Sequence, residues 1–458
     1  MSNKKNKPQD NSHSDNIPDF TVERLGSSNY DTPLIKHFNH EQTVEGFMDD
    51  SARIVYNPRV RSVKKFMEAG EDPPSIEVAG PRKKIFFDTA NVRAAIVTCG
   101  GLCPGLNDVI RSLFMELHYR YRVKEVLGVR FGYSGLCPRV GQPPIELTPE
   151  LVANIHRDGG TLLGSSRGPQ DPAEMVDFLE RMRINVLFSI GGDGTQRGAL
   201  DLANEIERRK LKIGVIGIPK TIDNDISYVE RSFGFNTAVS IARDVLSAGH
   251  EEARGAYNGV AVVKLMGRNS GFIAAMAAVA NGDANFVLIP EVPFDLEGDK
   301  GFFRALEKRL ENRRHALVVV AEGAGQDILE KEDLRRKFDA SGNVKLGDIG
   351  VYLRDKIAAH FSSGWHAATV KYIDPSYIIR SSPANADDSI FCSQLARHAV
   401  HAAMTGRTKM VVGIWNNTFT YVPMNLVISK RKQIDPYGSE WLSVLETTGQ
   451  PAVMKNEL

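Results

Sequence analysis

The chain has 458 residues, 42% of them hydrophobic and 25% charged, which is ordinary for a globular protein and long enough for two packed lobes. Its 57 basic and 56 acidic residues give a formal net charge of +1, so no overall positive field favours nucleic acid or an anionic membrane as a partner. Any phosphate-binding site must therefore be local.

The N-terminus lacks the apolar core of a signal peptide, and the apolar run at residues 272–280 is too short to span a bilayer. The cysteines, at positions 99, 103, 137 and 392, have no disulfide or zinc spacing, which favours reduced thiols. Cys99 and Cys103 lack a second pair or a nearby histidine that would complete four metal ligands. These features predict a cytoplasmic protein.

The first 92 residues carry no chemical signal. Residues 1–18 are polar and rich in Asn, Ser, Lys and Asp, a composition that predicts a disordered tail. Residues 19–92 mix scattered aromatics and prolines, and we interpret them as an N-terminal extension that wraps the body of the protein.

A regular alternation begins at residue 93. Short apolar runs end in glycine or proline and are followed by longer segments of helical spacing, such as residues 199–210. The runs predict buried strands at residues 93–98, 126–130, 186–190, 213–218, 259–265, 286–289 and 316–321. Strands that alternate with helices predict an α/β fold with mainly parallel sheets, flanked by helices and arranged as two Rossmann-like lobes. Ligands bind such sheets at the carboxyl ends of the strands.

The first strand leads into Thr98-Cys99-Gly100-Gly101-Leu102-Cys103-Pro104-Gly105-Leu106-Asn107, followed by a predicted helix at residues 108–121. Gly100 and Gly101 would let backbone N–H groups approach an anion, and the helix N-terminus adds a favourable dipole. The string matches neither the P-loop nor the dinucleotide fingerprint, and a tight strand-to-helix turn explains it equally well.

A second glycine loop, Gly191-Gly192-Asp193-Gly194-Thr195, follows the strand at residues 186–190. An aspartate that faces phosphates is costly unless a cation accompanies it, and Mg²⁺ bridging Asp193 and nucleotide phosphates would supply one. This string is typical of phosphotransferases, and NAD kinases and diacylglycerol kinases have similar loops.

The third loop, Pro219-Lys220-Thr221-Ile222-Asp223-Asn224-Asp225, also follows a strand. Carboxylates at i and i+2 of an extended segment point to one side, so Asp223 and Asp225 could divide proton transfer and metal binding between them. Two solvated loop carboxylates are the simpler interpretation of this pair alone.

Together with Met266-Gly267-Arg268, these three loops resemble the phosphofructokinase family, in the same order, over about residues 93–430. The sequence is most similar to the lineage of trypanosomal and plant ATP-dependent enzymes, which is related to pyrophosphate-dependent forms. The resemblance implies Mg²⁺-dependent transfer of the ATP γ-phosphoryl group to the 1-hydroxyl of fructose 6-phosphate in glycolysis. It also implies a homo-oligomer, a dimer or tetramer, because some relatives place substrate groups across a subunit boundary.

The resemblance assigns the two lobes and the roles of individual residues. Residues 93–235 and 379–420 would form the nucleotide-binding lobe, and residues 236–378 and 421–458 the sugar-phosphate lobe. Catalytic roles fall to Asp223 as general base and to Thr221, Lys220 and Arg268. The nucleotide would contact Gly100, Gly101, Arg167, Gly168, Gly192, Asp193, Gly194 and Thr195, and Mg²⁺ would be held by Asp193 with Asp225 close by. The sugar phosphate would contact Thr221, Ile222, Asp223, Met266, Gly267, Arg268, Glu322, Lys371, Tyr377 and Arg380.

Three positions depart from the bacterial pattern. Tyr377 replaces a histidine, while Lys371 and Gly259 replace arginines that bind phosphate, so a bidentate contact is lost. Affinity for fructose 6-phosphate and its cooperativity therefore do not follow from the resemblance.

Two residues bear on the identity of the phosphoryl donor, and they favour different donors. Gly194 leaves room for the α-phosphate and nucleoside of ATP, where pyrophosphate-dependent relatives have an aspartate. Lys220 is typical of pyrophosphate users, whereas bacterial ATP enzymes have glycine there. We give Gly194 more weight, because an added cation is compatible with either donor, and predict ATP.

The competing functions are a pyrophosphate-dependent phosphofructokinase, a NAD or lipid kinase, and a catalytically silent sugar-phosphate sensor. A NAD or lipid kinase does not explain residues 219–225 or 266–268. The sensor is disfavoured because Asp193 and Asp223 are both present.

Overall fold

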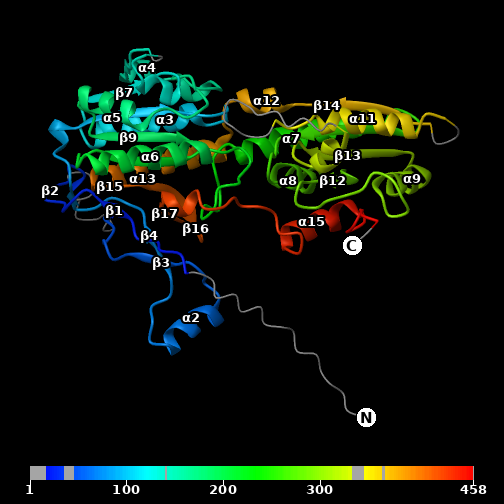
Figure 1. The fold of residues 1–458 in the computed structure, drawn as a ribbon, viewed down its shortest axis with the longest axis horizontal. Helices are drawn as coiled ribbons and strands as arrows, with labels where there is room; N and C mark the ends of the chain where they lie inside the picture. The colour runs from blue at the N-terminus through cyan, green and yellow to red at the C-terminus, as the bar shows by residue number, and fades with distance from the viewer. Residues whose placement is uncertain (1–16, 36–45, 140–141, 333–344, 364–366, 457–458) are drawn as a thin grey trace, which may run out of the picture.

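The computed structural model describes residues 17–35, 46–139, 142–332, 345–363 and 367–456. Two α/β lobes lie side by side, and the helix α2 (Val60–Glu68) projects from the larger one (Figure 1). Most of the predicted disordered tail, residues 1–16, lies outside the described residues. Within the described ranges, no helix is both long enough and apolar enough to cross a membrane.

The larger lobe is built on a nine-stranded sheet in the order β3-β4-β17-β16-β10-β9-β6-β7-β8. Its strands are β3 (Arg53–Val55), β4 (Ser75–Val78), β6 (Arg93–Thr98), β7 (Glu125–Val129), β8 (Ile145–Glu146), β9 (Val186–Gly191), β10 (Gly214–Pro219), β16 (Met410–Trp415) and β17 (Thr418–Pro423). The five central strands, β16, β10, β9, β6 and β7, are parallel, and the strands outside them pair antiparallel.

The smaller lobe contains a four-stranded parallel sheet in the order β12-β13-β11-β14. Its strands are β11 (Gly259–Leu265), β12 (Phe286–Leu288), β13 (His315–Ala321) and β14 (Thr369–Ile373). Two short ladders, β1 (Glu23–Arg24) with β15 (Arg407–Thr408) and β2 (Tyr30–Asp31) with β5 (Lys84–Ile85), join N-terminal residues to the larger lobe.

Helices cover both faces of each sheet. They are α2 (Val60–Glu68), α3 (Leu106–Met115), α4 (Pro149–Val152), α5 (Pro172–Arg181), α6 (Asp193–Arg208), α7 (Phe235–Arg254), α8 (Phe272–Asn281), α9 (Phe302–Arg313), α10 (Gln326–Glu332), α11 (Ile349–His360), α12 (Ser376–Ser381), α13 (Ala386–Met404), α14 (Met424–Val427) and α15 (Ser439–Thr448). In β6, Ala94 and Ile96 belong to the core that includes α3 and α13, while Ala95 and Val97 belong to the core that includes α5 and α6. This alternation explains why the strand is apolar throughout.

The α/β fold class is therefore confirmed, and each of the seven predicted strands is present within two residues of its expected bounds. The lobe boundaries remain a proposal. The strand β17 crosses the predicted boundary at residue 421 and lies wholly within the larger sheet.

Part of the predicted N-terminal extension is built into the larger lobe. It supplies β3 and β4, and a buried ionic network fastens it there. Arg407 is fully buried and forms ion pairs with Glu77 and, at 3.0 Å, with Asp50. Arg82 reaches the same Asp50 carboxylate at 2.9 Å. By contrast α2 buries no side chain, with Val60 and Met67 exposed.

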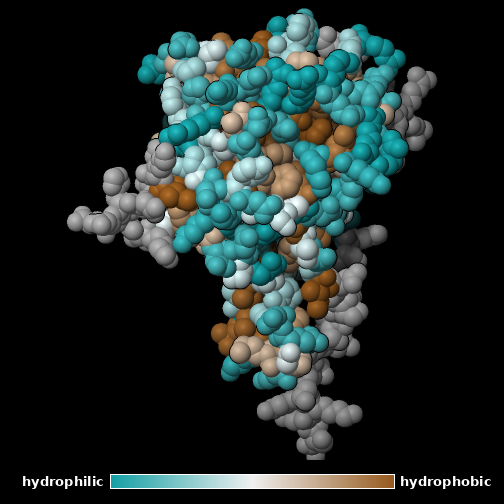
Figure 2. All heavy atoms as spheres, turned by 90° about the vertical axis from the view of Figure 1, so that its left-hand side faces the viewer, coloured by the Kyte–Doolittle hydropathy of each residue, from teal (hydrophilic) through white to brown (hydrophobic). Residues whose placement is uncertain are grey.

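Figure 2 views the molecule from the left side of Figure 1 and shows a largely hydrophilic surface over the larger lobe. Hydrophobic atoms gather on the narrow projection below the body. The exposed Val60 and Met67 of α2 belong to that projecting region.

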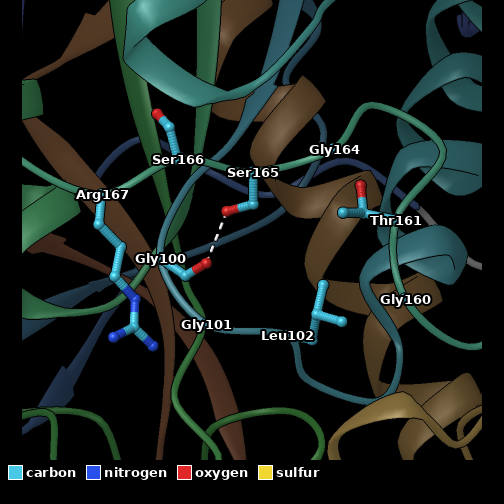
Figure 3. Close-up of a pocket in the computed structure, with 9 residues that line it drawn as sticks. All are labelled: Gly100, Gly101, Leu102, Gly160, Thr161, Gly164, Ser165, Ser166 and Arg167. Carbon is cyan, nitrogen blue, oxygen red and sulfur yellow. Dashed lines mark hydrogen bonds between the residues drawn. The ribbon is translucent and has the colours of Figure 1, made fainter.

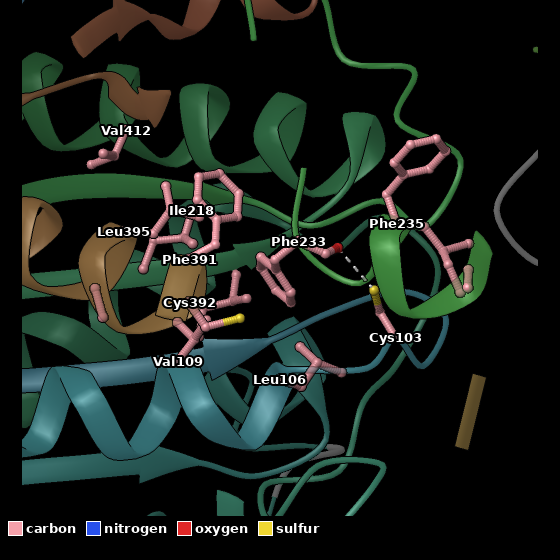
Figure 4. Close-up of a cluster of buried hydrophobic side chains, with 14 of the residues drawn as sticks. Cys103, Leu106, Val109, Ile218, Phe233, Phe235, Phe391, Cys392, Leu395 and Val412 are labelled. Atoms are coloured by element: carbon pink, nitrogen blue, oxygen red, sulfur yellow. Dashed lines mark hydrogen bonds between the residues drawn. The ribbon is translucent and has the colours of Figure 1, made fainter. Parts of the chain in front are cut away.

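A dense apolar cluster packs between α3, α13 and the segment that leads into α7 (Figure 4). Leu106 and Val109 of α3, Cys392 of α13 and Phe233 before α7 meet there, all almost fully buried. The Cys103 thiol donates a hydrogen bond to the Phe233 carbonyl at 3.3 Å. This packing fixes the loops that follow β6 and β10 relative to one another.

Two histidines of α13, the half-buried His398 and the buried His401, make the larger lobe sensitive to acid. His398 stacks on Phe419 at 4.6 Å, and its Nδ1 has no hydrogen-bond partner in the part of the chain that the structure describes. Burial, with help from Arg397 and Arg82, lowers the pKa of His398 to about 4, and burial also lowers the pKa of His401 well below its usual value. Folding therefore favours the neutral imidazoles.

We expect the protein to lose stability as the pH falls from about 6.5, where the unfolded histidine titrates, towards 4. At pH 5 the His398 imidazole is protonated in the unfolded chain but mostly neutral in the folded protein. This difference alone lowers the free energy of unfolding by about 2 kcal/mol. Urea unfolding at pH 7.5 and pH 5 measures the difference, and His398→Phe should remove the part due to His398 and leave the part due to His401. An equal pH dependence in both proteins would contradict this account.

Candidate active site

A cavity of about 840 Å³ opens between the strand ends of the two sheets. Residues that follow β6, β9 and β10 line it from the larger lobe, and Arg268 and Glu322, which follow β11 and β13, line it from the smaller one. Arg380 of α12 and Arg431 complete the wall. Loops predicted separately from the sequence thus meet in one space.

The first loop is a tight turn that exposes backbone groups. Gly100 has a φ of +85°, a left-handed conformation that favours glycine, and its N–H donates to the Ser166 carbonyl at 3.0 Å. The Ser165 hydroxyl donates to the Gly100 carbonyl at 2.6 Å (Figure 3). These two bonds hold residues 164–167 alongside the loop.

Arg167 extends from this second segment past the glycines. A methyl group added to Gly101 would lie 3.2 Å from its Nη2, so the guanidinium approaches the backbone of the loop closely (Figure 3). A side cavity of about 510 Å³ lies between the two segments and includes Gly160 and Thr161 in its wall. The arrangement gives an anion both backbone and guanidinium donors.

The second loop delivers a helix N-terminus to the cavity. The 16-residue helix α6 begins at Asp193, directly after β9. Buried Gln196 donates from Nε2 to the Gly191 carbonyl at 2.9 Å and fixes the turn. A Cβ placed on Gly194 would meet nothing within 4 Å, so open space lies next to the amide groups that begin the helix.

The third loop is braced by its own side chains. The Thr221 hydroxyl donates to Asp225 Oδ1 at 2.8 Å and accepts from the Asp223 N–H at 3.2 Å. Asn224 adopts a φ of +55°, and its Oδ1 accepts from the Ser232 N–H at 3.0 Å. These bonds turn the Asp223 carboxyl away from the loop and into the cavity that it lines.

Asp223 has the most perturbed carboxyl of the site. Burial first, then the neighbouring Asp225 and Glu322, raise its pKa to about 7, against a smaller opposite effect of Arg380. Its buried Oδ1 has no hydrogen-bond partner among the residues that the structure describes. A buried acceptor that lacks a donor is suited to take a proton from a substrate hydroxyl.

Lys220 connects the first and third loops. Its ammonium donates to the Gly101 carbonyl at 2.6 Å, its own N–H donates to the Gly191 carbonyl at 3.0 Å, and its side chain is buried. Burial is the main cause of its lowered pKa. A buried cation held this close to the glycine loops can interact strongly with phosphate.

The cavity wall mixes both signs of charge, as a site for a metal–phosphate complex requires. Its cations are Arg167, Arg197, Lys220, Arg268, Arg380 and Arg431, and its carboxylates are Asp193, Asp201, Asp223, Asp225 and Glu322. The described residues contain no group of three or more Asp, Glu, His or Cys side chains that could hold a metal ion alone. Mg²⁺ fits nevertheless, because it commonly takes one or two carboxylates and completes its shell with phosphate oxygens and water.

The predicted metal ligands share a cationic partner. Asp193 Oδ2 and Asp225 Oδ2 each lie 3.6 Å from a different nitrogen of the Arg431 guanidinium. The two carboxylates therefore converge on one positively charged position, which is what a shared divalent cation requires.

The sugar-phosphate residues divide into two groups. Arg268, Glu322 and Arg380 line the cavity. Met266 is instead fully buried in the core, and Gly267, with a φ of +124°, shapes the turn that presents Arg268. Neither Met266 nor Gly267 belongs to the cavity wall.

Lys371 and Tyr377 also lie outside this cavity. Lys371 is exposed on the edge strand β14, and the Tyr377 side chain on α12 is 83% exposed. Gly259, the third departure from the bacterial pattern, lies at the start of β11, where an added Cβ would collide with the Ala253 carbonyl. No phosphate-binding side chain fits at that position.

Several polar wall residues were not predicted, among them Tyr133, Ser166, Arg197, Asp201 and Arg431. Ser166 and Tyr133 lie within two residues of a glycine, and Arg197 follows the second loop by two residues, so these three could have been found from the glycine-rich loops. Arg431 has no comparable signal. All four cysteines are free and buried, as expected for reduced thiols.

Comparison with known proteins identifies the chain through both sequence and fold. Residues 93–403 match the family model described as phosphofructokinase. Among curated relatives, the ATP-dependent 6-phosphofructokinase of Borreliella burgdorferi is 49% identical over 96% of this chain and 98% of its own length. The enzyme of the same name from Trypanosoma brucei brucei is 47% identical over 94% of this chain and 87% of its own length.

Solved structures agree on the fold. The pyrophosphate-dependent phosphofructokinase of Marinobacter aquaeolei superposes with a TM-score of 0.64 at 19% identity, covering 79% of this chain and 92% of that one. Pichia pastoris phosphofructokinase in the T-state gives 0.60 at 21% identity, covering 79% and 37%. The strand-end loops, the cavity that they line and these matches lead to one conclusion: the chain belongs to the phosphofructokinase family.

Proposed function

We propose that this protein is an ATP-dependent 6-phosphofructokinase, which converts fructose 6-phosphate and ATP into fructose 1,6-bisphosphate and ADP. The single observation that carries the proposal is the position of the Asp223 carboxyl, in one cavity with the helix N-terminus at Asp193 and the buried ammonium of Lys220. The names of the similar bacterial and trypanosomal enzymes support the same activity.

In this mechanism the chain positions two substrates in line and moves one proton. Asp223 takes the proton from the sugar 1-hydroxyl as its oxygen bonds to the γ-phosphorus and the bond to ADP breaks. Lys220 and Arg268 offset the negative charge on the transferring and departing phosphates. Glu322 and Arg380 would orient the sugar and its 6-phosphate, and the glycine loops with Arg167 would hold the nucleotide.

A divalent cation completes the charge balance. We propose that Asp193 and Asp225 hold Mg²⁺, which when bound neutralises charge on the donor phosphates. The support is the convergence of both carboxylates on one cationic group.

We predict that ATP, and not pyrophosphate, supports turnover of the purified protein. Open space beside Gly194 accommodates the rest of a nucleotide, whereas pyrophosphate has nothing to place there. Fructose 1,6-bisphosphate formation, followed with aldolase and triose-phosphate-linked enzymes, is measured with each donor at equal concentration. The kcat/KM for ATP should exceed that for pyrophosphate by at least about 100-fold, a difference of about 2.8 kcal/mol.

Equal or faster turnover with pyrophosphate would instead favour a pyrophosphate-dependent phosphofructokinase, the donor with which Lys220 agrees. If neither donor supports turnover but fructose 6-phosphate still binds, the sugar-phosphate sensor becomes the better interpretation.

We also propose a homo-oligomer. Lys371 and Tyr377, which the family resemblance assigns to the sugar phosphate, are exposed and lie outside the cavity of their own chain. A second copy could bring them to substrate. Native mass spectrometry measures the state directly.

A further inference from the structure

Arg431 lies in the segment that joins α14 of the larger lobe to α15 below the smaller one (Figure 1). This segment is outside the residues that match the family model, which end at 403. The guanidinium nevertheless reaches the cavity. There Nη2 lies 3.6 Å from Asp193 Oδ2 and Nη1 lies 3.6 Å from Asp225 Oδ2, so one side chain connects the second and third loops.

The backbone of this segment is fixed to the third loop. Arg431 pairs with Ile226 in an antiparallel bridge, and the Lys432 N–H donates to the Asp225 carbonyl at 2.9 Å. The Lys432 ammonium then donates to the Glu230 carbonyl at 2.8 Å and the Val229 carbonyl at 3.1 Å. The segment that carries Arg431 is therefore attached to the loop that carries the proposed base, and this attachment sets its position relative to Asp223.

The side chain itself is held only loosely. Both ion pairs are longer than a hydrogen bond, and the Arg431 side chain is 36% exposed. Such pairs contribute little to stability, whereas guanidinium and phosphate form short, charge-assisted and often bidentate bonds. A phosphate group that entered the cavity would be the stronger partner.

A second arginine makes the exchange feasible. Arg197 Nη2 lies 3.4 Å from both carboxylate oxygens of Asp193, so that carboxylate keeps a cation when Arg431 leaves. Asp225 keeps the Thr221 hydroxyl as a donor at 2.8 Å. Neither group is left without a partner during the change.

We propose that Arg431 is a donor-binding residue that exchanges partners. Without a donor, its guanidinium occupies the position between Asp193 and Asp225 and prevents a free divalent cation from settling there. When the metal–nucleotide complex arrives, the cation takes the carboxylates and the guanidinium turns to the phosphate oxygens. The metal would then bind well only together with its phosphates. This inference rests on the proposed function for the identity of the donor.

The test compares Arg431→Gln with Lys430→Gln. Lys430 is the preceding residue, is exposed and does not line the cavity, so the control makes the same charge change on the same segment. Mn²⁺ binding without nucleotide is measured by electron paramagnetic resonance, and MgATP binding without sugar by titration calorimetry. Arg431→Gln should bind Mn²⁺ at least about 5-fold more tightly and MgATP about 10- to 100-fold more weakly, while Lys430→Gln stays within about 2-fold of wild type. Arg431→Lys keeps the charge but cannot form a bidentate contact, so its affinity for MgATP should lie between those of wild type and Arg431→Gln.

Opposite changes in the two affinities are the signature, because a merely structural defect would weaken both. Loss of both affinities, no change in either, or weaker MgATP binding with unchanged Mn²⁺ binding would each overturn the exchange. The Mn²⁺ measurement needs no nucleotide, so it decides the carboxylate half of the inference even if the donor proves to be pyrophosphate. Failure of wild-type protein to bind MgATP would count against the proposed function instead.

Discussion

Replacing Asp223 with serine is expected to lower kcat by about 10²- to 10⁴-fold with a much smaller change in KM, the usual scale for the loss of a general base. The physical reason lies in the raised pKa of this carboxyl, about 7, which lets it accept a proton near neutral pH. Serine keeps a small polar group in the loop but cannot hold the proton. Steady-state kinetics with both substrates varied measure the effect. A change confined to KM would contradict the assignment.

The same variant should be at least as stable as wild type, which separates lost chemistry from lost folding. The pKa of Asp223 is raised from 3.8 to about 7, so folding favours the protonated form. The stability that this group contributes is full below pH 3.8 and is lost as the pH rises through 7. At pH 8 wild type carries a buried carboxylate beside Asp225 and Glu322, and Asp223→Ser does not. Thermal unfolding at pH 8 should therefore give an equal or higher Tm for the variant, and a lower Tm would mean that the loop itself needs the carboxyl.

Much of the two parallel sheets could be predicted because their central strands are buried on both faces. Such strands are apolar at every position, and residues 93–98 and 259–265 became strands with the expected bounds. Parallel strands place their carboxyl ends at one edge of the sheet. The glycine loop after β9 and the aspartate-bearing loop after β10 were therefore expected to be neighbours, and the Lys220 N–H bond to the Gly191 carbonyl at 3.0 Å joins them.

The strands β3, β4, β16 and β17 at one side of the larger sheet were not predicted. β16 and β17 form a hairpin whose outer end carries polar residues, and β4 from the N-terminal extension pairs with β17 across more than 330 positions of sequence. No local pattern encodes a partner that far away. The burial of the charged Arg407 side chain could not be predicted from the sequence either, because it depends on tertiary contacts with Glu77 and Asp50.

In the candidate site, the sequence predicted where the loops lie but not which of their side chains reach the cavity. The Met266-Gly267-Arg268 string was correctly located after a strand, but its methionine points into the core and only the arginine reaches the cavity. Arg431 lies in a basic run with Lys430 and Lys432, which contains no glycine and does not directly follow a parallel strand in the sequence. Its position depends on the bridge to Ile226, a contact that composition and periodicity do not reveal.

Introducing aspartate at Gly194 is expected to abolish the use of ATP, by about 10³-fold or more in kcat/KM. A carboxylate there would project into the open space next to the start of α6 and oppose the α-phosphate of the nucleotide, and juxtaposed like charges cost several kcal/mol. The fold should tolerate the change, because nothing lies within 4 Å of the added Cβ and φ is outside the left-handed region. An acidic residue in the first turn of a helix is also favourable.

Two further substitutions at the same position separate volume from charge. Gly194→Ala adds only the Cβ and should keep ATP turnover within about 3-fold of wild type, since that atom has no neighbour to displace. Gly194→Asn has the shape of aspartate without its charge, so an intermediate loss would divide the effect between steric exclusion and repulsion. Donor assays with ATP and pyrophosphate are run on all three variants. Normal ATP turnover by Gly194→Asp would show that the nucleotide takes another route out of the cavity, and the weight given to Gly194 over Lys220 in assigning the donor would then be wrong.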